Sequence, residues 1–411
     1  MNDLAAELQA RGHEVTVLTG KPNYPSGNFY PGYGFFGKTK ESYKGCTVIR
    51  SPLMPRRSGS SVPLALNYFS FAFFASVLAP FVCRGSYDAV FVYEISPVTV
   101  AFPAIVMKKL IRKPLYFWVQ DLWPESLVAT GAVKSKFVLA RVGEMVRYIY
   151  RQCDVILMQS ERFRESLEKH GVPGDKIRYL PNWAEPYYRP IDIPDSIRRP
   201  AFPEGFTVVF AGNMGAAQDL PTVLAAAEHL KEYADIKWVL IGDGRMRGWV
   251  ERQVADRGLA NAVHLLGNHP PETMPTYFAL ADALLVTLRE SEIFALTIPS
   301  KLQSYLACGK PIISNVDGET NRILELSGAG IGCAFADPRA LADAVLRLYR
   351  MDESERTEMG ERGLRYYRTY FERSVLIDRL ERMLLDSIAE RGEGEENVES
   401  DDHRRYSAGD H

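Results

Sequence analysis

Two glycine-bearing turns in the second half of the chain directly follow apolar runs typical of β-strands. The runs and their glycines are 207–211 with Gly212 and Gly215, and 238–241 with Gly242 and Gly244. Glycine lets a ligand approach the backbone closely, and the N-terminus of a following helix attracts phosphate. Since open α/β sheets bind ligands beyond the carboxyl ends of their strands, the pair of turns predicts a site for a phosphorylated ligand. An ordinary tight turn remains the alternative for either turn alone.

Lys301 lies in the first turn of a helix that Pro299 and Ser300 are expected to begin. A lysine there opposes the helix dipole, so it is better suited to binding an anion than to stabilising the helix. A solvated lysine is the alternative. The residues predicted to bind substrate in this half of the chain are Gly212, Asn213, Gly215, Gln218, Gly242, Asp243, Gly244, Arg247, Ser300, Ser304 and Glu319.

Carboxylates follow a strand-like run in the first half of the chain. Asp121 and Glu125 flank Trp123 directly after the run 115–119. A carboxylate at such a strand end can orient a hydroxyl group or accept its proton. The alternative is that Asp121 caps the following turn. Glu94 lies at an analogous strand end and is a weaker candidate for the same role.

Length, charge and cysteine content indicate which class of protein the chain belongs to. The chain has 411 residues, 49 Lys and Arg against 51 Asp and Glu, and 46% apolar residues, as in an ordinary soluble globular protein of two domains. No long basic run indicates nucleic-acid binding. Five scattered cysteines indicate neither a disulfide framework nor a zinc site, and no signal peptide is visible, so we expect a cytoplasmic protein.

Short apolar runs alternate with helical segments, which predicts two series of parallel βαβ units. We expect an α/β protein with two doubly wound, Rossmann-like domains at 1–188 and 207–368. The proline-rich stretch 189–206 is the predicted linker. A helix at 369–390 is expected to pack back on the first domain, and the acidic tail 391–411 is expected to be disordered.

Residues 63–83 form the most apolar stretch and follow the basic sequence MPRRSG. A helix of this length measures about 30 Å, enough to cross a bilayer. Asn67, Ser70 and Ser76 weaken that interpretation. Three possibilities therefore stay open: a buried helix, a helix lying in a membrane interface, and a membrane span.

The motifs AGNMGAAQ, IGDG and LACGKPII, with RGHEVTVLTG, SERFRESL, KIRYLPNW and FALADALLV, resemble retaining glycosyltransferases of the family-4 type. PNYPSG, QDLWPES and PSKLQSYLACGKP are similar to the bacterial group that builds O-antigen, capsule and colanic-acid-like polysaccharides, including fucosaminyl transferases. The resemblance covers about residues 1 to 385. It implies the GT-B architecture, in which two Rossmann-like domains face a cleft.

The resemblance implies a metal-independent transferase that uses no cofactor and moves a hexosyl or N-acetylhexosaminyl group from a nucleotide-diphosphate sugar, most commonly a UDP-sugar. The second domain would bind the donor. The first would bind a lipid-linked saccharide acceptor at the cytoplasmic membrane face, with 63–83 in peripheral contact. Lys301 would stabilise the departing diphosphate, and Asp121, supported by Glu125, would serve the acceptor.

Three departures from the family pattern carry consequences. The chain begins on a helix, where the family begins with a strand and a glycine-rich loop, so we expect a truncated start. The family's paired glutamates fall at Leu296 and Ser304, and Ser304 would reach a ribose hydroxyl more weakly. The usual Arg and Lys correspond to Asn213 and Gln218, which leaves Lys301 and Arg247 to meet the diphosphate. A GT-B sugar-nucleotide epimerase and a non-catalytic or impaired partner protein remain alternatives.

Overall fold

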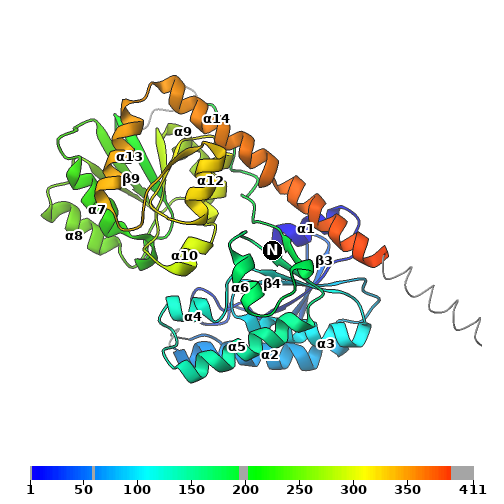
Figure 1. The fold of residues 1–411 in the computed structure, drawn as a ribbon. Helices are drawn as coiled ribbons and strands as arrows, with labels where there is room; N and C mark the ends of the chain where they lie inside the picture. The colour runs from blue at the N-terminus through cyan, green and yellow to red at the C-terminus, as the bar shows by residue number, and fades with distance from the viewer. Residues whose placement is uncertain (1, 58–60, 194–201, 390–411) are drawn as a thin grey trace, which may run out of the picture. The chain divides into compact units, whose positions relative to one another are not determined.

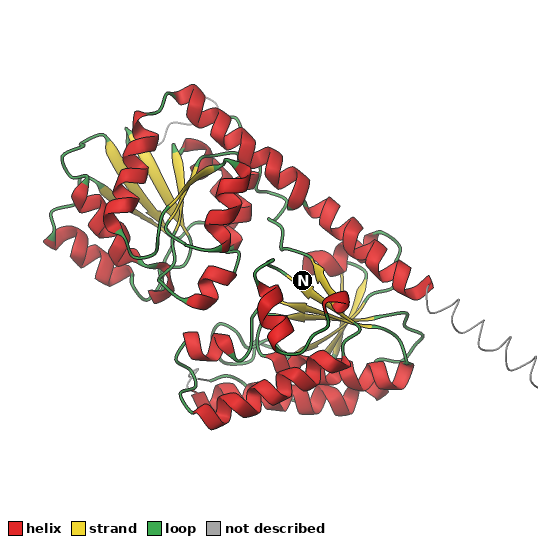
Figure 2. Ribbon diagram, viewed as in Figure 1, coloured by secondary structure: helices red, strands yellow, loops and turns green. Residues whose placement is uncertain are grey.

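The computed structural model describes residues 2–57, 61–193 and 202–389, which fall into two compact units. Unit 1 contains residues 1–159 and 163–180 together with the segment that starts at Ile377. Unit 2 contains residues 160–162 and 181–376. Each unit combines strands with surrounding helices (Figures 1 and 2). Part of the predicted linker, 194–201, and the predicted tail lie outside the described residues.

The strands of unit 2 form one sheet that is parallel throughout the described residues. Its order is β10-β9-β8-β11-β12-β13. The strands are β8 (Phe206–Ala211), β9 (Ile236–Ile241), β10 (Val263–Gly267), β11 (Ala283–Val286), β12 (Ile312–Ser314) and β13 (Gly330–Gly332). The chain order reverses between β8 and β11, and this reversal is the switch point at which doubly wound sheets bind ligands. The prediction of a doubly wound α/β domain is therefore confirmed for the second half of the chain.

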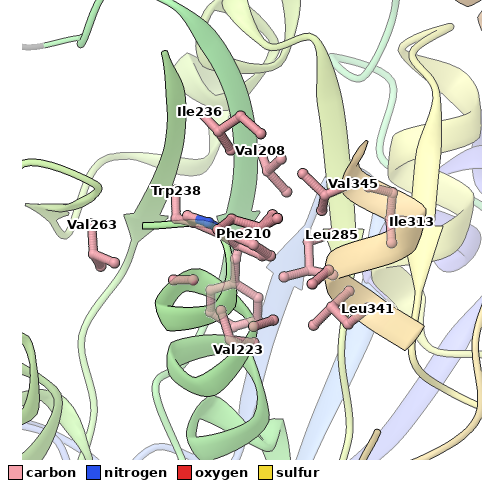
Figure 3. Close-up of a cluster of buried hydrophobic side chains, with 14 of the residues drawn as sticks. Val208, Phe210, Val223, Ile236, Trp238, Val263, Leu285, Ile313, Leu341 and Val345 are labelled. Carbon is pink, nitrogen blue, oxygen red and sulfur yellow. The ribbon is translucent and has the colours of Figure 1, made fainter. Parts of the chain in front are cut away.

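Burial explains why these segments become strands. Every residue of β8 and β11 is buried, as expected for central strands covered by helices on both faces. On one face Phe210 and Trp238 pack with Leu285 and with Val345 of the covering helix α13 (Figure 3). The helices of this unit are α7 (Leu220–His229), α8 (Arg247–Asp256), α9 (Met274–Leu280), α10 (Glu292–Leu296), α11 (Ser300–Ala307), α12 (Glu319–Ser327), α13 (Pro338–Arg350) and α14 (Glu353–Tyr370).

Unit 1 divides its described strands between two sheets. One sheet has the order β1-β3-β2, and the other is the parallel sheet β4-β5-β6-β7. The strands are β1 (Thr16–Gly20), β2 (Lys40–Tyr43), β3 (Cys46–Ser51), β4 (Val90–Glu94), β5 (Leu115–Val119), β6 (Val155–Met158) and β7 (Ile177–Tyr179). The antiparallel hairpin β2–β3 turns through Lys44 and Gly45, both with positive φ. The sequence analysis did not anticipate it, because β2 is short, polar and largely exposed.

The helices of unit 1 are α1 (Asn2–Ala10), α2 (Ser61–Val82), α3 (Ala101–Ile111), α4 (Glu125–Ala129), α5 (Lys136–Gln152) and α6 (Phe163–Lys169). Short 3₁₀ turns occur at η1 (Val98–Val100) and η2 (Gly174–Lys176) here and at η3 (Ala216–Gln218) and η4 (Pro271–Thr273) in unit 2. The apolar stretch 63–83 thus lies in α2. By length and composition alone, α2 meets the criteria for a membrane span.

The helical segment 373–389 brings the end of the described chain onto unit 1. Arg11 forms ion pairs with Asp378 at 2.6 Å and with Glu381 at 2.7 Å. The Tyr116 hydroxyl, from strand β5, donates a hydrogen bond to the carbonyl oxygen of Met383 at 2.7 Å. Polar contacts from both α1's end and β5 therefore fasten this segment to unit 1.

Candidate functional site

The two glycine turns of unit 2 lie against each other at the carboxyl end of the sheet. The Gly212 amide donates to the carbonyl of Ile241 at 2.9 Å, and the Met214 amide donates to that of Asp243 at 2.7 Å. Gly242 has φ +135°, and a Cβ atom there would lie 1.9 Å from the Gly212 carbonyl oxygen. No other residue fits at that position without moving backbone, so the sequence signal of paired glycines reflects a real close approach.

Lys301, from the first turn of α11, reaches the first of these turns. A Cβ atom at Gly212 would lie 2.7 Å from Lys301 Cε, and Lys301 Nζ lies 4.6 Å from the centre of the Phe210 ring. The ammonium donates a hydrogen bond to the side-chain oxygen of Gln218. Within the part of the chain that the structure describes, no ion pair with a carboxylate involves Lys301. Burial lowers its pKa to about 8. A cation held among neutral groups is suited to receiving an anion.

Hydrogen bonds join the loops that follow β8 and β11 at the switch point. The Thr287 hydroxyl donates to the carbonyl oxygen of Gln218 at 3.0 Å, and the Arg289 amide donates to that of Ala217 at 2.9 Å. These bonds hold Gln218 where it contacts Lys301. Fully buried Thr287 carried no signal in the sequence, because its importance depends on pairing with a residue 69 positions away.

The other predicted residues of the glycine turns differ in how open they are to a ligand. A Cβ atom at Gly244 would lie only 2.5 Å from the side-chain oxygen of Asn213, so Asn213 packs against the second glycine turn. Exposed Asp243 accepts a 2.7 Å hydrogen bond from the Gly244 amide. Arg247 at the start of α8 pairs with Glu251 at 2.9 Å. Because a carboxylate already compensates Arg247, Lys301 is the stronger candidate for an anion.

Ser300, Ser304 and Glu319 stand on the two helices that follow β11 and β12. The Ser304 hydroxyl donates to the Ser300 carbonyl at 3.2 Å, within α11. Glu319, at the first position of α12, is fully buried, and its two oxygens accept hydrogen bonds from Arg322 at 2.8 and 2.6 Å. A buried, doubly bonded carboxylate keeps a fixed orientation. Its neighbour Thr320 is fully buried with an unpartnered hydroxyl, which the sequence analysis did not single out.

In unit 1, two carboxylates lie at the carboxyl ends of the neighbouring strands β4 and β5. Glu94 is fully buried, and its Oε2 accepts hydrogen bonds from the backbone amides of Gln120 at 3.3 Å and Asp121 at 3.2 Å. Burial raises the pKa of Asp121 to about 6, although a hydrogen bond with the Ser96 side chain opposes the rise. Ser96 has φ +135°, a strained backbone conformation of the kind found at functional sites. Asp121 thus titrates near neutrality, which suits a proton acceptor.

Glu94 was the weaker candidate by sequence, and the structure explains what it contributes. Burial raises its pKa well above the usual range, and one of its oxygens, Oε1, has no hydrogen-bond partner. Its other oxygen fixes the backbone from which the Asp121 side chain projects. Helix α4 begins at Glu125 after Pro124, with no side-chain cap. No hydrogen bond therefore supports the alternative role of Asp121 as a cap of that helix.

Glu125 is engaged by α6 and the residue that follows it. Its Oε1 lies 3.0 Å from His170 Nε2 and accepts a hydrogen bond from the Ser166 hydroxyl at 3.0 Å. Burial, the largest single effect, acts to raise the pKa of Glu125, but the hydrogen bonds with His170, with its own backbone amide and with Ser166, together with the charge of His170, lower the pKa overall. Glu125 ties the loop after β5 to α6. Sequence reasoning missed His170, because the contact spans 45 positions.

The described residues contain no group of three or more His, Cys, Asp or Glu side chains arranged to hold a metal ion. Polar side chains, backbone amides and one lysine make up the unit 2 site.

The chain has the GT-B fold of glycosyltransferases. One α/β unit carries a cation and glycine turns at its switch point, and the other carries carboxylates beyond β4 and β5. Residues 1–183 match the "Glycosyl transferase 4-like domain", and residues 205–351 match "Glycosyl transferases group 1". The chain accordingly combines the two domains of family-4 glycosyltransferases. The prediction of a GT-B fold is confirmed.

Curated relatives are bacterial glycosyltransferases. WbjE of Pseudomonas aeruginosa, described as a glycosyltransferase, is 29% identical over 61% of this chain, and the alignment spans 65% of that relative, slightly under two thirds. WcaI of Escherichia coli, described as a glycosyl transferase of colanic acid biosynthesis, is 24% identical over 76% of this chain and 78% of its own length.

Solved structures share the fold at low sequence identity. A sucrose-phosphate synthase from Thermosynechococcus elongatus has a TM-score of 0.71 at 18% identity and covers 94% of this chain and 92% of its own. HepE of Anabaena, solved with UDP and glucose, has a TM-score of 0.63 at 13% identity and covers 90% of this chain and 99% of its own.

Proposed function

We propose that this protein transfers a sugar, of the hexosyl or N-acetylhexosaminyl type, from a UDP-sugar to a lipid-linked saccharide in the synthesis of a bacterial surface polysaccharide. It works at the cytoplasmic face of the membrane, in peripheral contact through residues 63–83. Several observations support the proposal. WcaI is described by its role in colanic acid biosynthesis, and several structural neighbours were solved with UDP or a UDP-sugar. The resemblance of PSKLQSYLACGKP to the fucosaminyl-transferase group favours an amino sugar.

The observation that carries the proposal is the position of Lys301 beside Gly212 at the switch point of unit 2. In the proposed reaction the bond between the sugar's anomeric carbon and the diphosphate breaks, and negative charge develops on the diphosphate. Lys301 and the backbone amides of 212–215 are the donors that would meet this charge, and such electrostatic stabilisation is usually the largest contribution to catalysis. The transfer proceeds without an essential metal and with retention of anomeric configuration, as the family resemblance implies.

Asp121 is the proposed group on the acceptor side. The acceptor hydroxyl forms the new bond to the anomeric carbon and loses its proton. With a pKa of about 6, Asp121 is largely ionised at neutral pH and is still basic enough to hold the hydroxyl by a hydrogen bond and take up that proton. Glu94 and Glu125 are positioning residues, since their hydrogen bonds fix the loop on which Asp121 stands.

The test is release of free UDP by the purified chain from a panel of UDP-sugars, with and without a lipid-linked saccharide extract. We expect release that depends on the acceptor and that falls strongly in Lys301→Met. The matched control is Lys310→Met, which removes a lysine at the start of β12, the opposite end of the sheet. Conversion of the sugar without acceptor would instead indicate an epimerase. Tight donor binding with no turnover under any condition would indicate a non-catalytic partner protein.

A further inference from the structure

Helix α2 has one face that packs into unit 1 and another that does not. Ala72, Ala75 and Ala79 are buried, as is Asn67. Six apolar side chains, each at least half exposed, recur at steps of three and four residues and so lie along one side of the helix. This outward row consists of Val62, Leu66, Phe69, Phe73, Val77 and Phe81. It extends for about 29 Å at 1.5 Å per residue.

The loop 21–38 adds aromatic side chains beside this row. The Phe35 ring lies 5.4 Å from the ring of Phe74, whose neighbour Phe73 belongs to the row. Phe36 is 94% exposed. Exposed phenylalanines in such number are costly in water, and a contiguous apolar patch of this kind marks a contact site.

The layer that contains α2 is strongly basic. Helices α2, α3 and α5 lie together in unit 1 (Figure 1), with contacts between α2 and α3 and between α3 and α5. With their flanking residues these helices span 54–86, 98–113 and 130–152, which contain three, four and five Lys or Arg residues. Glu144 is the single acidic residue in the three segments, and Arg141 pairs with it at 2.7 Å. Asp154, two residues beyond the third segment, pairs with Lys108 at 2.7 Å, and the remaining basic residues still outnumber the acidic ones. The whole chain, in contrast, has a net charge of −2.

Exposed basic side chains lie beside exposed apolar ones on the other two helices. Leu110 is 58% exposed at the end of α3, next to exposed Lys109 and close to exposed Arg112. Phe137 is 69% exposed at the start of α5, beside exposed Lys136. Long basic side chains reach lipid headgroups while apolar neighbours enter the acyl boundary. An anionic lipid surface complements both features at once.

The contacts of α2 favour a helix that lies along the membrane over one that crosses it. The Asn67 side-chain amide donates to the Met54 carbonyl at 2.5 Å, and the Ser70 hydroxyl accepts from the Met54 amide at 2.8 Å. The buried alanines hold the remaining length of the helix against the unit. To span a bilayer, α2 would have to lose these contacts and surround itself with lipid. Lying in the interface requires no change in the fold.

We propose that unit 1 docks on an anionic bilayer surface through the outward row of α2, with the basic residues of α3 and α5 against the headgroups and α2 parallel to the membrane plane. The inference deepens the proposed function and rests on it for its purpose, since a lipid-linked acceptor is presented at such a surface. The docking itself is a physical property that can be measured without turnover.

The experiment is co-sedimentation of the full chain with phosphatidylcholine vesicles and with vesicles that also contain phosphatidylglycerol, at low and high salt. We expect binding to the anionic vesicles and at least tenfold weaker binding to the neutral ones or at 1 M salt. The double variant Phe69→Ser/Phe81→Ser should bind at least tenfold more weakly. These two side chains are chosen because they are exposed and outside the Phe35–Phe74 cluster, and a melting curve checks that the variant is folded. Leu326→Ser, an equally exposed apolar residue of unit 2, is the control that should bind normally.

The preference for anionic lipid and the depth of insertion of α2 are tested separately. Lys109→Glu/Arg112→Glu should remove the preference for anionic lipid, and Phe69→Trp should show blue-shifted fluorescence with vesicles. Equal vesicle binding by the wild type and Phe69→Ser/Phe81→Ser would overturn the proposal. So would resistance of the bound chain to alkaline carbonate, which indicates a span, or dimerisation without lipid that the serine variant abolishes. A chain that binds vesicles but releases no UDP would contradict the proposed function while leaving the docking intact.

Discussion

Gly212 and Lys301, 89 positions apart in the chain, are in such close contact that a Cβ atom at residue 212 would lie 2.7 Å from Lys301 Cε. Gly212 also has φ +144°, a conformation that side chains rarely adopt. The lysine can therefore extend across the first glycine turn only because residue 212 has no side chain. Five predictions test this relationship and other contacts within the two units.

Gly212→Ala should displace the Lys301 ammonium and weaken binding of UDP-sugars by about tenfold, the equivalent of about 1.4 kcal/mol. The strained φ should also lower the free energy of unfolding by about 1 kcal/mol or more. Titration calorimetry and denaturant unfolding measure the two effects. Gly258→Ala is the matched control, because Gly258 also has positive φ and lies near a lysine, Lys231, but outside the site. Equal losses of affinity in both variants would remove Gly212 from the binding site.

The affinity for UDP-sugars should depend on pH through Lys301. Burial lowers the pKa of Lys301 to about 8, so the free protein carries the ammonium below pH 8 and loses it above. A bound diphosphate favours the charged form, and affinity should therefore be constant at lower pH and fall as pH rises through about 8. Lys301→Met should bind more weakly by about 1.5 to 3 kcal/mol and show no fall. A wild-type affinity that stays level from pH 7 to 9.5 would exclude Lys301 as the diphosphate cation.

Asp121→Asn should abolish sugar transfer while making the protein more stable at neutral pH. Burial raises the pKa of Asp121 from 3.8 to about 6, so the ionised carboxylate destabilises the folded state above pH 3.8, with the full penalty above pH 6. After allowance for partial exposure, the variant should gain on the order of 1 to 2 kcal/mol at pH 7.5 and little near pH 4. Denaturant unfolding at both pH values tests this. The exposed Asp88→Asn should change neither stability nor turnover.

The pH dependence of the wild-type transfer rate, measured with limiting acceptor, tests the same role of Asp121. If ionised Asp121 acts on the acceptor, the rate rises with pH through about 6. A rate that is flat from pH 5 to 7.5, or an Asp121→Asn protein with normal turnover, would contradict the role.

Glu381→Gln should loosen the segment 373–389 from unit 1. Glu381 lies 2.7 Å from Arg11 and 2.6 Å from His13, and these hydrogen bonds hold the pKa of its carboxyl below the usual range. Its neutralisation should cost about 1 kcal/mol of stability and speed hydrogen exchange across 373–389. Asp386→Asn, at an exposed position of the same helical segment, should exchange at the wild-type rate. Unchanged exchange in Glu381→Gln would assign the anchoring to the buried Ile377 and Leu380 alone.

The strands that could be predicted from sequence were those with continuous apolar runs. The boundaries of β5 agree with the run 115–119, because a central parallel strand is buried on both faces. Strands β2, β3, β7 and β13 were missed. Strands β2, β7 and β13 are three or four residues long and contain polar residues or glycine, and polar residues interrupt the apolar ones of β3. Such segments become strands only when a neighbouring strand supplies their hydrogen bonds.

For the site, the pattern of residues predicted the glycine turns, Lys301 and Asp121 as candidates, because these residue types follow strands at recognisable positions. It did not predict that Thr287 and Gln218 would hold Lys301 at Gly212, or that Ser96 and Glu94 would surround Asp121. The pKa of each candidate depends on burial, and burial is decided by residues far away in the chain.

The sequence by itself determined the alternation of strands and helices, the two-domain plan, the glycines at strand ends and the apolar stretch 63–83, since each depends on residues near one another in the chain. Only the tertiary structure decided the strand order that creates the switch point, which side chains meet there, and which face of α2 stays outside. Those outcomes follow from packing the elements together, because side chains tens of residues apart become neighbours only when sheets and helices bury their apolar faces.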